Sequence, residues 1–490
     1  MSPKPPATFG SVVSLAVIVS AVSAFSAVSP SRGVAQAGKE QVARYLDAQQ
    51  TRFAGVAHQI WTFAEVGYQE EKSSALLQQQ LKDAGFTMET GVAGMPTAFL
   101  ASYGQGRPII ALLAEFDALP GLSQDAVPER KPLKELGAGH GCGHHLFGTA
   151  STAAAIAVKE WLAGARRSGT IRLYGTPAEE GGSGKVYMVR AGLFNDVDAV
   201  VSWHPGDQND AGPSTNLANT SAKFRFRGLS AHAAAAPDRG RSALDGVEAM
   251  NHMANLMREH VPSDTRIHYV ITSGGQAPNV VPDFAEVYYY VRHPDPRVVQ
   301  SIFERLVKAG EGAATGTGTT MEYEIIGGTY SRLPNEALQR VLDANLQTVG
   351  GVTYTPEEQA FAEKIYATLT DPTNRIGSQQ TVRPYAMHRT NASSDAGDVS
   401  WVVPSAQFSA ATWVPGTPAH SWQAVAAGGM SIGPKGMAVA AKTLALSVVD
   451  LFQKPDVIQT ARAEFSQKRG PNFSYKPLLG DRPPALDYRR

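Results

Sequence analysis

The pattern of apolar residues changes at about residue 222, and this change constrains the fold more than any other feature of the chain. Over residues 222–331 we expect strands at 223–228, 267–272, 285–291 and 320–326, and helices at 243–261 and 296–309. The order of strand, helix, strand, strand, helix, strand is typical of a ferredoxin-like α+β module. A module of about 110 residues is close to the usual size of a domain. We therefore expect it to be inserted into a larger domain.

The segments on either side of this module alternate helices with short buried strands. Apolar residues recur at helical spacing over 41–65, 72–84, 146–162, 338–349, 356–369 and 434–452, and apolar strand-like runs cover 108–113, 170–174 and 199–203. This alternation predicts an α/β sheet with helices on both faces. Since 490 residues exceed what one hydrophobic core usually organises, we expect residues 38–221 and 332–490 to form one domain around the insert at 222–331. The Pro-rich tail after Lys454 is expected to be peripheral.

The balance of charges indicates the kind of partner. Lys and Arg together number 44, and Asp and Glu together also number 44, so the formal net charge is +0. This balance gives no sign of a basic surface for nucleic acid or of a polybasic membrane patch. We expect the partner to be a small molecule.

The first residues resemble an export signal. Lys4 supplies a short positive region, residues 12–28 are small and apolar, and Ala35-Gln36-Ala37 offers a cleavage site. Serines dilute the apolar run, which is short for crossing a bilayer of about 30 Å, so a stable membrane anchor is the weaker interpretation. We expect residues 1–37 to be a signal peptide and the mature chain to be periplasmic or secreted.

The single cysteine lies in the stretch GAGHGCGHHLFGTA, residues 137–150, among three histidines. A lone cysteine cannot form an internal disulfide, so Cys142 is a reactive thiol, a metal ligand or a buried small residue. Residues i and i+2 of an extended loop point the same way, so Cys142 and His144 could face one cavity.

Three further places carry residues of the metal-ligand type. Glu179 and Glu180 follow the strand at 170–174, and His204 directly follows the strand at 199–203. Open α/β sheets bind their ligands at the carboxyl ends of strands. Adjacent glutamates there cost repulsion and desolvation unless a cation compensates them. With His420 in a later Gly-rich and Trp-rich stretch, these residues indicate a metal site.

Eight further stretches form a pattern along the chain. They are LLAEFDALPG (112–121), GHGCGHHLFGTA (139–150), TPAEEGGSGK (176–185), SWHPG (202–206), GLSAHAAAAPDRGRSALDG (228–246), GGQAPNVVPD (274–283), SSDAGDVSW (393–401) and PGTPAHSW (415–422). In this order they resemble the amidohydrolase branch of the M20 metallopeptidases. The resemblance covers nearly the whole expected mature chain. It implies a dinuclear-metal α/β exopeptidase-type catalytic domain, and it implies that the ferredoxin-like insert is a lid and dimerisation domain.

The resemblance also implies roles for the site residues. Two divalent ions, zinc or manganese, would share the thiolate of Cys142 as a bridging ligand. The other metal ligands would be His144, Glu180, His204 and His420. Glu179 would be the general base that acts on a water activated by the ions. Asp117 would orient a ligand histidine, and the role of His145 stays open.

In the insert, the resemblance implies that His232 donates a hydrogen bond to the oxyanion that forms during the reaction. In the family such a histidine often reaches the site across a dimer interface. Asn279 and Arg292 match positions that bind substrate, and Arg292 could hold a carboxylate bidentately. Structural interpretations stay open, since His232 could be a surface turn residue and Arg292 a strand-edge charge. The resemblance implies a homodimer through the lid or a companion subunit.

The expected reaction is hydrolysis of the amide bond of an N-aroyl or N-acyl amino acid, with p-aminobenzoyl-glutamate as the first substrate to test. Alternatives within the family are a dipeptidase or carboxypeptidase and a deacylase acting on another acyl group. Two alternatives outside it are a hydrolase with Cys142 as nucleophile and a periplasmic binding protein. The stretch EGGSGK at 180–185 lacks the spacing of a phosphate-binding P-loop, so its glycines are expected to let the loop pack beside the metals.

Overall fold

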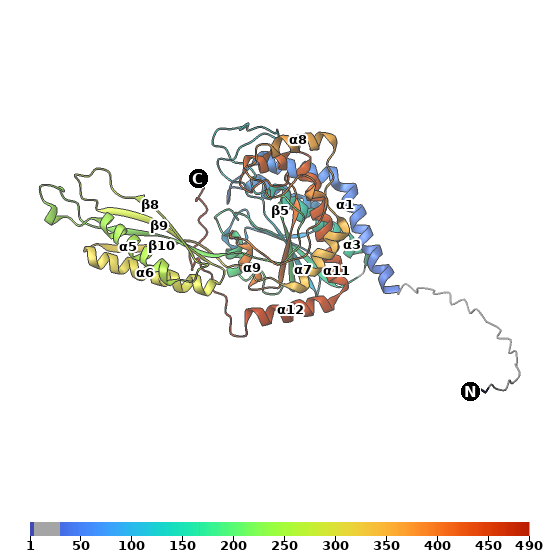
Figure 1. Ribbon diagram of the computed structural model, residues 1–490. Coiled ribbons are helices and arrows are strands. Elements are labelled where there is room, and N and C mark those ends of the chain that lie inside the picture. Colours follow the sequence, from blue (N-terminus) through green and yellow to red (C-terminus); the bar gives the residue numbers. More distant parts are fainter. Residues whose placement is uncertain (4–29, 166, 490) are drawn as a thin grey trace.

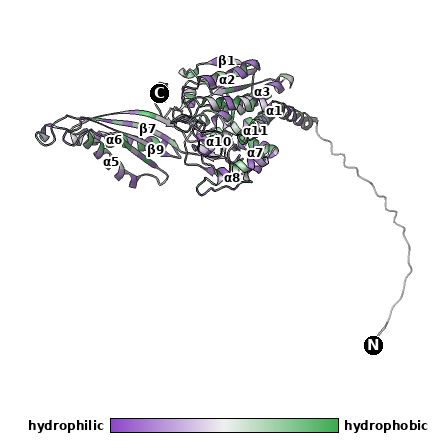
Figure 2. Cartoon of the chain, turned by 90° about the horizontal axis from the view of Figure 1, so that it is seen from above, coloured by the Kyte–Doolittle hydropathy of each residue, from purple (hydrophilic) through white to green (hydrophobic). Residues whose placement is uncertain are grey.

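The computed structural model describes residues 1–3, 30–165 and 167–489. It consists of a rounded α/β domain and an elongated lid that projects from one side (Figure 1). Seen from above, the lid again stands clear of the α/β domain (Figure 2). Most of the expected signal segment, residues 4–29, lies outside the described residues.

A six-stranded mixed sheet forms the centre of the α/β domain, in the order β1-β2-β4-β3-β5-β12. Its strands are β1 (Thr87–Thr90), β2 (Phe99–Gln105), β3 (Ile109–Ala114), β4 (Gly169–Gly175), β5 (Ala199–Gly206) and β12 (Ser405–Ala411). Strands β4, β3, β5 and β12 run parallel, whereas β1 and β2 are antiparallel to their neighbours. The carboxyl ends of the four parallel strands therefore meet at one edge of the sheet, where the metal-type residues are expected.

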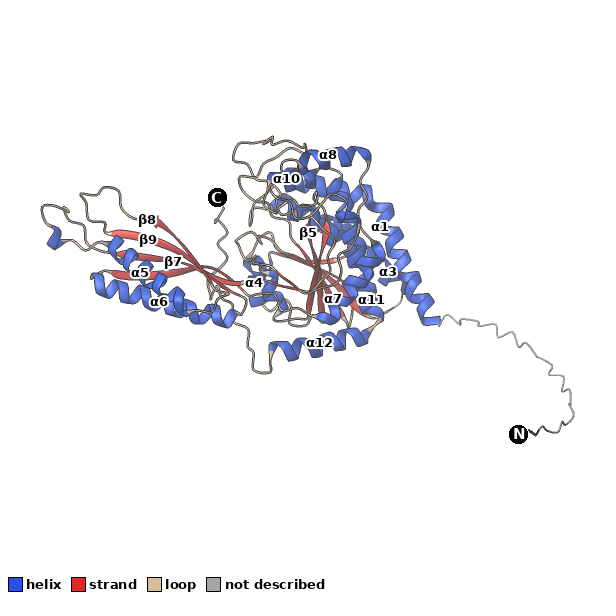
Figure 3. Cartoon of the chain, in the orientation of Figure 1, coloured by secondary structure: helices blue, strands red, loops and turns tan. Residues whose placement is uncertain are grey.

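Helices cover both sides of this sheet (Figure 3). They are α1 (Pro30–Phe63), α2 (Glu71–Asp83), α3 (His144–Ala165), α4 (Gly184–Arg190), α7 (Glu336–Val349), α8 (Pro356–Tyr366), α9 (Ala396–Ser400), α10 (Trp422–Gly429), α11 (Ile432–Gln453) and α12 (Pro455–Arg469). Helices α1, α3, α7 and α11 pack together on one side, and α4 lies on the other (Figure 3).

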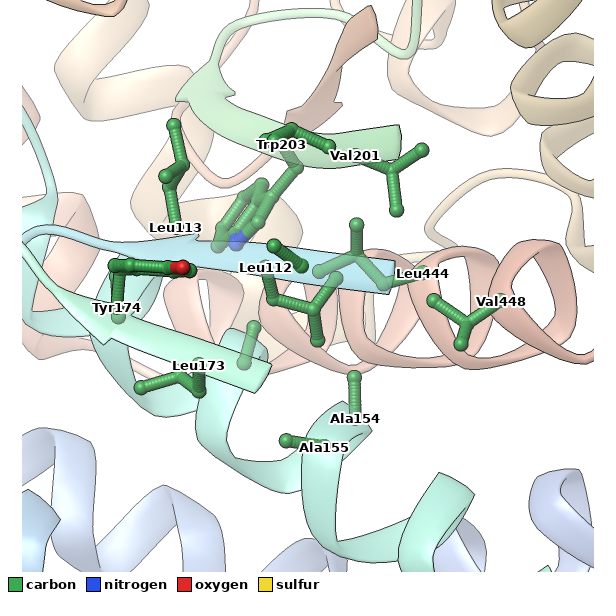
Figure 4. Packing of buried hydrophobic residues seen from close by; sticks show 14 of the residues in the cluster. Leu112, Leu113, Ala154, Ala155, Leu173, Tyr174, Val201, Trp203, Leu444 and Val448 are labelled. Atoms are coloured by element: carbon green, nitrogen blue, oxygen red, sulfur yellow. The ribbon is translucent and has the colours of Figure 1, made fainter. Parts of the chain in front are cut away.

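Strand and helix side chains interlock in the core of the α/β domain. Leu112, Leu173 and Trp203 from three strands meet Ala154 of α3 and Leu444 of α11 (Figure 4). Within the described part of the chain, α11 is the one helix long and apolar enough to cross a membrane, but 83% of its apolar window is buried inside the protein. It is the central helix of a packed core.

The lid has the expected ferredoxin-like architecture. It contains β7 (Ala218–Arg227), α5 (Ala243–Met257), β8 (Arg266–Ser273), β9 (Phe284–His293), α6 (Pro296–Thr317) and β10 (Thr320–Thr329). The four strands pair antiparallel in the order β10-β7-β9-β8. Phe224, Phe226 and Val287 pack against α5 and α6 in a core separate from that of the α/β domain. The predicted fold class, an α/β domain with a ferredoxin-like insert, is confirmed.

The prediction of a peripheral tail after Lys454 is wrong. Residues 455–469 form α12, whose Ile458 and Ala461 are buried in the α/β core. The following residues run back to the junction of the two domains, where Leu478 packs in the lid core and Leu479 in the α/β core. The tail is therefore part of the contact between the domains.

Candidate metal centre

The predicted metal ligands gather at the carboxyl edge of the parallel strands. Glu179 and Glu180 follow β4, and His204 lies near the end of β5. Cys142 lies just before α3, His144 is the first residue of that helix, and His420 precedes α10. These elements are far apart in the sequence, so the strand topology of the sheet brings the side chains together.

The thiol of Cys142 belongs to two groups of possible metal ligands. One group is Cys142, His144 and His204, and the other is Cys142, Glu180 and His420. Within each group all ligand atoms lie within 4.8 Å of one another. Cys142 Sγ is 3.6 Å from His204 Nε2, and His420 Nε2 is 3.1 Å from Glu180 Oε1. A shared sulfur between two three-ligand groups is the arrangement that a thiolate bridging two ions requires.

A turn, and not an extended loop, directs Cys142 and His144 to the same place. The Gly143 amide donates to the carbonyl of His140 at 3.1 Å, and His144 then begins α3. Gly143 has a φ of 74°, and a Cβ there would lie 2.7 Å from Pro205 Cβ, so this position requires glycine. His420, with a φ of 58°, is a non-glycine residue in the left-handed region, which is common at functional sites.

Hydrogen bonds orient the imidazole rings toward the cluster. His144 Nδ1 donates to Asp117 Oδ1 at 2.8 Å, and His204 Nδ1 donates to the carbonyl of Pro205 at 2.7 Å. Asp117 Oδ2 also accepts the backbone N–H of Glu180 at 2.9 Å. The Nε2 atoms of both rings are thereby left for the centre of the cluster, as in metal-binding histidines. Asp117 supports two predicted ligands at once.

The electrostatics of the cluster favour ligand and base chemistry. Burial opposes ionisation of the Cys142 thiol, but the imidazoles of His204 and His144 hold its pKa well below the usual range. Burial, Glu115 and Glu180 together hold the pKa of Glu179 well above its usual range. A raised pKa makes a carboxylate a stronger base than an ordinary glutamate. This is the property that the predicted role of Glu179 needs.

A buried charge network behind the cluster was missed by the sequence analysis. Lys185 Nζ lies 2.8 Å from Glu115 Oε1 and 2.7 Å from Asp395 Oδ1, and all three side chains are buried. Glu115 Oε2 in turn lies 3.0 Å from His144 Nε2. The sequence does indicate Glu115, because at the end of a buried strand its side chain points to the same face as that of Asp117, two residues later. The partnership of Lys185 with Asp395 had no signal in the local sequence.

Replacing Lys185 with Met is expected to lower the free energy of unfolding by roughly 3–5 kcal/mol, because Glu115 and Asp395 would remain buried without their cation. The matched control is Lys442→Met, which removes a lysine paired with Asp47 near the surface. That change should cost at most about 1 kcal/mol. Urea denaturation measures the free energy of unfolding of both variants. An equal loss of stability in the two variants would contradict the stabilising role proposed for the buried network.

His145, whose role the sequence left open, is a structural residue. Its ring is fully buried, and Nε2 donates to the carbonyl of Gly428 at 3.1 Å. Burial and the neighbouring His140 ring hold its pKa well below the usual range, so it stays neutral. It joins α3 to α10 and lies outside both groups that contain Cys142.

The metal cluster opens into two adjoining cavities that share Glu179, Glu180 and His420. The larger, about 550 Å³, also contains Cys142, His204 and Arg332, and the smaller, about 320 Å³, contains Arg292, Tyr288 and Tyr290 from the lid. Arg332 was not singled out from the sequence. Its Nη1 donates to Ser214 Oγ at 3.0 Å. Each cavity thus has an arginine available for a carboxylate ligand.

The lid separates its three predicted site residues. Arg292 lies opposite Asn219 in the register of β9 and β7, at the end of the lid sheet next to the α/β domain. His232 and Asn279 lie in loops beyond the other end of these strands, which is marked by Arg227 and Phe284. The Ala233 amide donates to the Asn279 carbonyl at 3.0 Å, which holds these loops together. Ten-residue strands span about 30 Å. Among the described residues that line the two cavities, neither His232 nor Asn279 is present.

Comparison with known proteins identifies the family. The profile of peptidase family M20/M25/M40 matches residues 111–444, more than half of the chain. The chain belongs to this family. It is accordingly a hydrolase that acts on amide bonds, and the predicted family resemblance is confirmed.

Individual relatives of this M20 chain cover most of its length. One of the subunits of p-aminobenzoyl-glutamate hydrolase from Escherichia coli is 43% identical over 87% of this chain and 95% of its own. A mouse Xaa-Arg dipeptidase is 26% identical over 88% of this chain and 92% of its own. The crystal structure of an aminobenzoyl-glutamate utilization protein from Klebsiella pneumoniae superposes with a TM-score of 0.58 at 21% identity, covering 84% of this chain and 98% of that one. The last comparison establishes a shared fold.

The donor set of this M20 chain suits divalent metal ions. A thiolate, three imidazoles and a carboxylate together are typical ligands for zinc and also serve manganese. His144 Nε2 is buried 3.0 Å from Glu115 Oε2, and Glu180 Oε1 is buried 3.1 Å from His420 Nε2. Within the described residues, neither His144 Nε2 nor Glu180 Oε1 makes a well-aligned hydrogen bond. Buried polar atoms are rarely left in this state, so these two are suited to ion coordination.

Proposed function

We propose that this chain hydrolyses the amide bond of N-aroyl amino acids that carry a free carboxylate, with p-aminobenzoyl-glutamate as the first substrate. One observation carries the proposal: two ligand groups share Cys142 beside Glu179, in cavities that also contain Arg292 and Arg332. The similarity to a relative named for p-aminobenzoyl-glutamate supports the choice of substrate.

The proposed cofactor is a pair of divalent ions, and the thiolate ligand favours zinc over manganese. When bound, the ions supply water activation and polarisation of the amide carbonyl. Cys142, His144 and His204 would hold one ion, and Cys142, Glu180 and His420 the other. Glu179 accepts the proton of the attacking water and returns it to the leaving amine nitrogen. Asp117 keeps His144 and the Glu180 backbone in place for both ions.

The arginines would orient the substrate. A guanidinium offers paired N–H donors that match a carboxylate, and Nε of Arg292 is buried without a hydrogen-bond partner in the described part of the chain. Ser214 already fixes the direction of Arg332. An amino acid with two carboxylates could engage one arginine with each group. Glutamate is such a leaving group.

A panel of substrates tests the proposal after reconstitution with Zn²⁺ or Mn²⁺. p-Aminobenzoyl-glutamate, N-benzoyl-alanine, N-acetyl-glutamate and an Xaa-Arg dipeptide can be compared by chromatography of the released amine. We expect the first to have the highest kcat/KM, because it combines the aromatic acyl group with two carboxylates. Faster cleavage of the dipeptide would contradict the proposed specificity, and no cleavage with either metal would contradict the proposed function.

We further propose that two copies of the chain pair through their lids. Strand β8 is one of the two edge strands of the lid sheet and exposes Val270 and Ile271, which favours pairing with another strand. His232 and Asn279 are too far from the cluster of their own chain, so they would serve the site of a partner copy. A companion chain is the alternative, because two similar E. coli proteins are named as subunits A and B of p-aminobenzoyl-glutamate hydrolase. A mass measurement in solution distinguishes the two arrangements.

The two lid residues are expected to leave different kinetic signatures. Arg292→Ala should raise KM chiefly for substrates with a free carboxylate, whereas His232→Ala should lower kcat by roughly 10²–10³, as expected for an oxyanion donor. Steady-state kinetics on a substrate and its decarboxylated analogue measure both effects. If Arg292→Ala impairs the analogue as much as the parent, the carboxylate role is wrong.

Mixing inactive variants adds a control for the pairing. A protomer carrying His232→Ala keeps Glu179, and one carrying Glu179→Gln keeps His232, so a mixed dimer contains one complete site. Random mixing in a two-fold dimer should recover about a quarter of the wild-type activity. Absence of any recovery, with mixed dimers shown by mass, would contradict the action of His232 across the interface.

A further inference from the structure

We infer that the C-terminal strap, residues 470–489, positions the metal ligand Glu180. The strap returns from α12 across the junction of the domains and ends beside the loop that follows β4. The inference rests on the proposed role of Glu180 as a ligand. It assigns a function to a segment that lies outside both cavities and supplies none of the predicted ligands.

Two strap side chains hold the carbonyl of Glu180. The hydroxyl of Tyr488 donates to this oxygen at 3.0 Å, and Nη2 of Arg489 donates to it at 2.8 Å. The N–H of Glu180 donates to Asp117 on its other side. The backbone of Glu180 is therefore fixed at both ends, once by a residue of the α/β domain and twice by the strap.

The loop that carries Glu180 needs such support. Ala178 and Ser183 have φ values of 54° and 59°, which are unusual for residues other than glycine and cost energy that surrounding contacts must offset. Tyr68 adds to the support, since its hydroxyl donates to the Gly182 carbonyl at 2.7 Å and its ring packs edge-on against Tyr488. Without the strap, the carbonyl of Glu180 would lose both of its side-chain donors.

The strap is itself firmly attached along its length. Arg482 donates to the Ile325 carbonyl of β10 at 2.7 Å, and Arg190 of α4 donates to the Gly480 carbonyl at 3.1 Å. Gln69 donates to the Leu486 carbonyl at 2.8 Å. A segment anchored to the lid, to α4 and beside α2 can hold Glu180 in a fixed direction. Tyr488 and Arg489 are thus positioning residues that act through the backbone of a ligand.

Metal binding by the full-length chain tests this role directly. The double variant Tyr488→Phe/Arg489→Gln should lose affinity for one of two Co²⁺ ions by about 10–100-fold, the usual effect of removing partners that orient a ligand. The other ion should keep its affinity, because Cys142, His144 and His204 are untouched. Asp487→Asn is the matched control, since it changes an exposed neighbour and leaves both donors in place. Competition with a chelator measures the affinities.

Two outcomes would overturn the inference: unchanged binding of both ions in the double variant, or an equal loss in Asp487→Asn. If the double variant does not fold, as judged by circular dichroism, Tyr488→Phe decides alone. It removes one hydroxyl and keeps the ring packed on Tyr68, and unchanged affinity there also overturns the inference. Failure of the proposed function is distinguishable, because a wild type that binds two ions but cleaves no amide contradicts only the function.

Discussion

Replacing Cys142 with Ser is expected to lower the affinity for both metal ions together. A hydroxyl does not ionise near neutral pH and cannot bridge two cations as a thiolate does. Because the sulfur is common to both ligand groups, the loss should exceed the roughly 10–100-fold that removal of an orienting partner costs. Elemental analysis beside an activity assay measures the effect, and full metal content with normal turnover would contradict the bridging role.

Two controls distinguish a ligand thiol from a nucleophile. Cys142→Asp supplies a carboxylate that can also bridge two ions, so part of the metal content and activity should return. A nucleophilic cysteine would tolerate neither change. In wild type, o-phenanthroline should abolish activity. If it leaves activity intact while iodoacetamide removes it, Cys142 is the nucleophile and the metal interpretation fails.

The clustering of the candidate ligands could be predicted because it follows from topology. Residues at the carboxyl ends of parallel strands meet at one edge, so Glu179, Glu180 and His204 could be placed together from strand positions alone. The extended loop predicted for Cys142 and His144 is wrong, because a turn at Gly143 aligns the two side chains. The residue pattern was sufficient, although the local conformation differed.

Pairings between distant segments could not be predicted in the same way. Lys185 and Asp395 are separated by 210 positions, and nothing in either local sequence indicates the other. Buried charges are recognised by their partners, and partners are defined only by the fold. The same holds for Tyr488 and Arg489, whose target is a backbone carbonyl 308 and 309 positions away.

The Pro-rich end of the tail obscures the helix that precedes it. Ile458, Ala461 and Phe465 are spaced by three and four residues, which is the pattern of a buried helix face, and they are buried in α12. The strand at 405–411 is likewise hard to predict, because its polar residues alternate with two alanines and one phenylalanine. The helical pattern of α12 and the alternating pattern of β12 are both present in the sequence, but each contains few large apolar residues.

Glu179 and Glu180, adjacent in sequence, are expected to respond differently to the same substitution. Glu179→Gln keeps the size of the side chain but removes its basicity. Metal should stay bound, while kcat falls by at least the roughly 10²–10⁴ typical of general acid–base catalysis. The raised pKa of Glu179, caused by burial and the nearby Glu115 and Glu180, is consistent with a proton-transfer role.

Glu180→Gln, in contrast, replaces a charged ligand with a weak neutral one, so metal affinity should fall and activity should partly return at high metal concentration. In the structure Glu180 lies in a group of possible metal ligands with Cys142 and His420, and Glu179 lies in a further group of possible ligands with Glu115 and His144, so the two roles are distinguished by experiment. Titration of both variants with Zn²⁺ or Mn²⁺, following metal content and turnover together, measures the difference. If Glu179→Gln loses the metal while Glu180→Gln keeps it, the two roles are reversed.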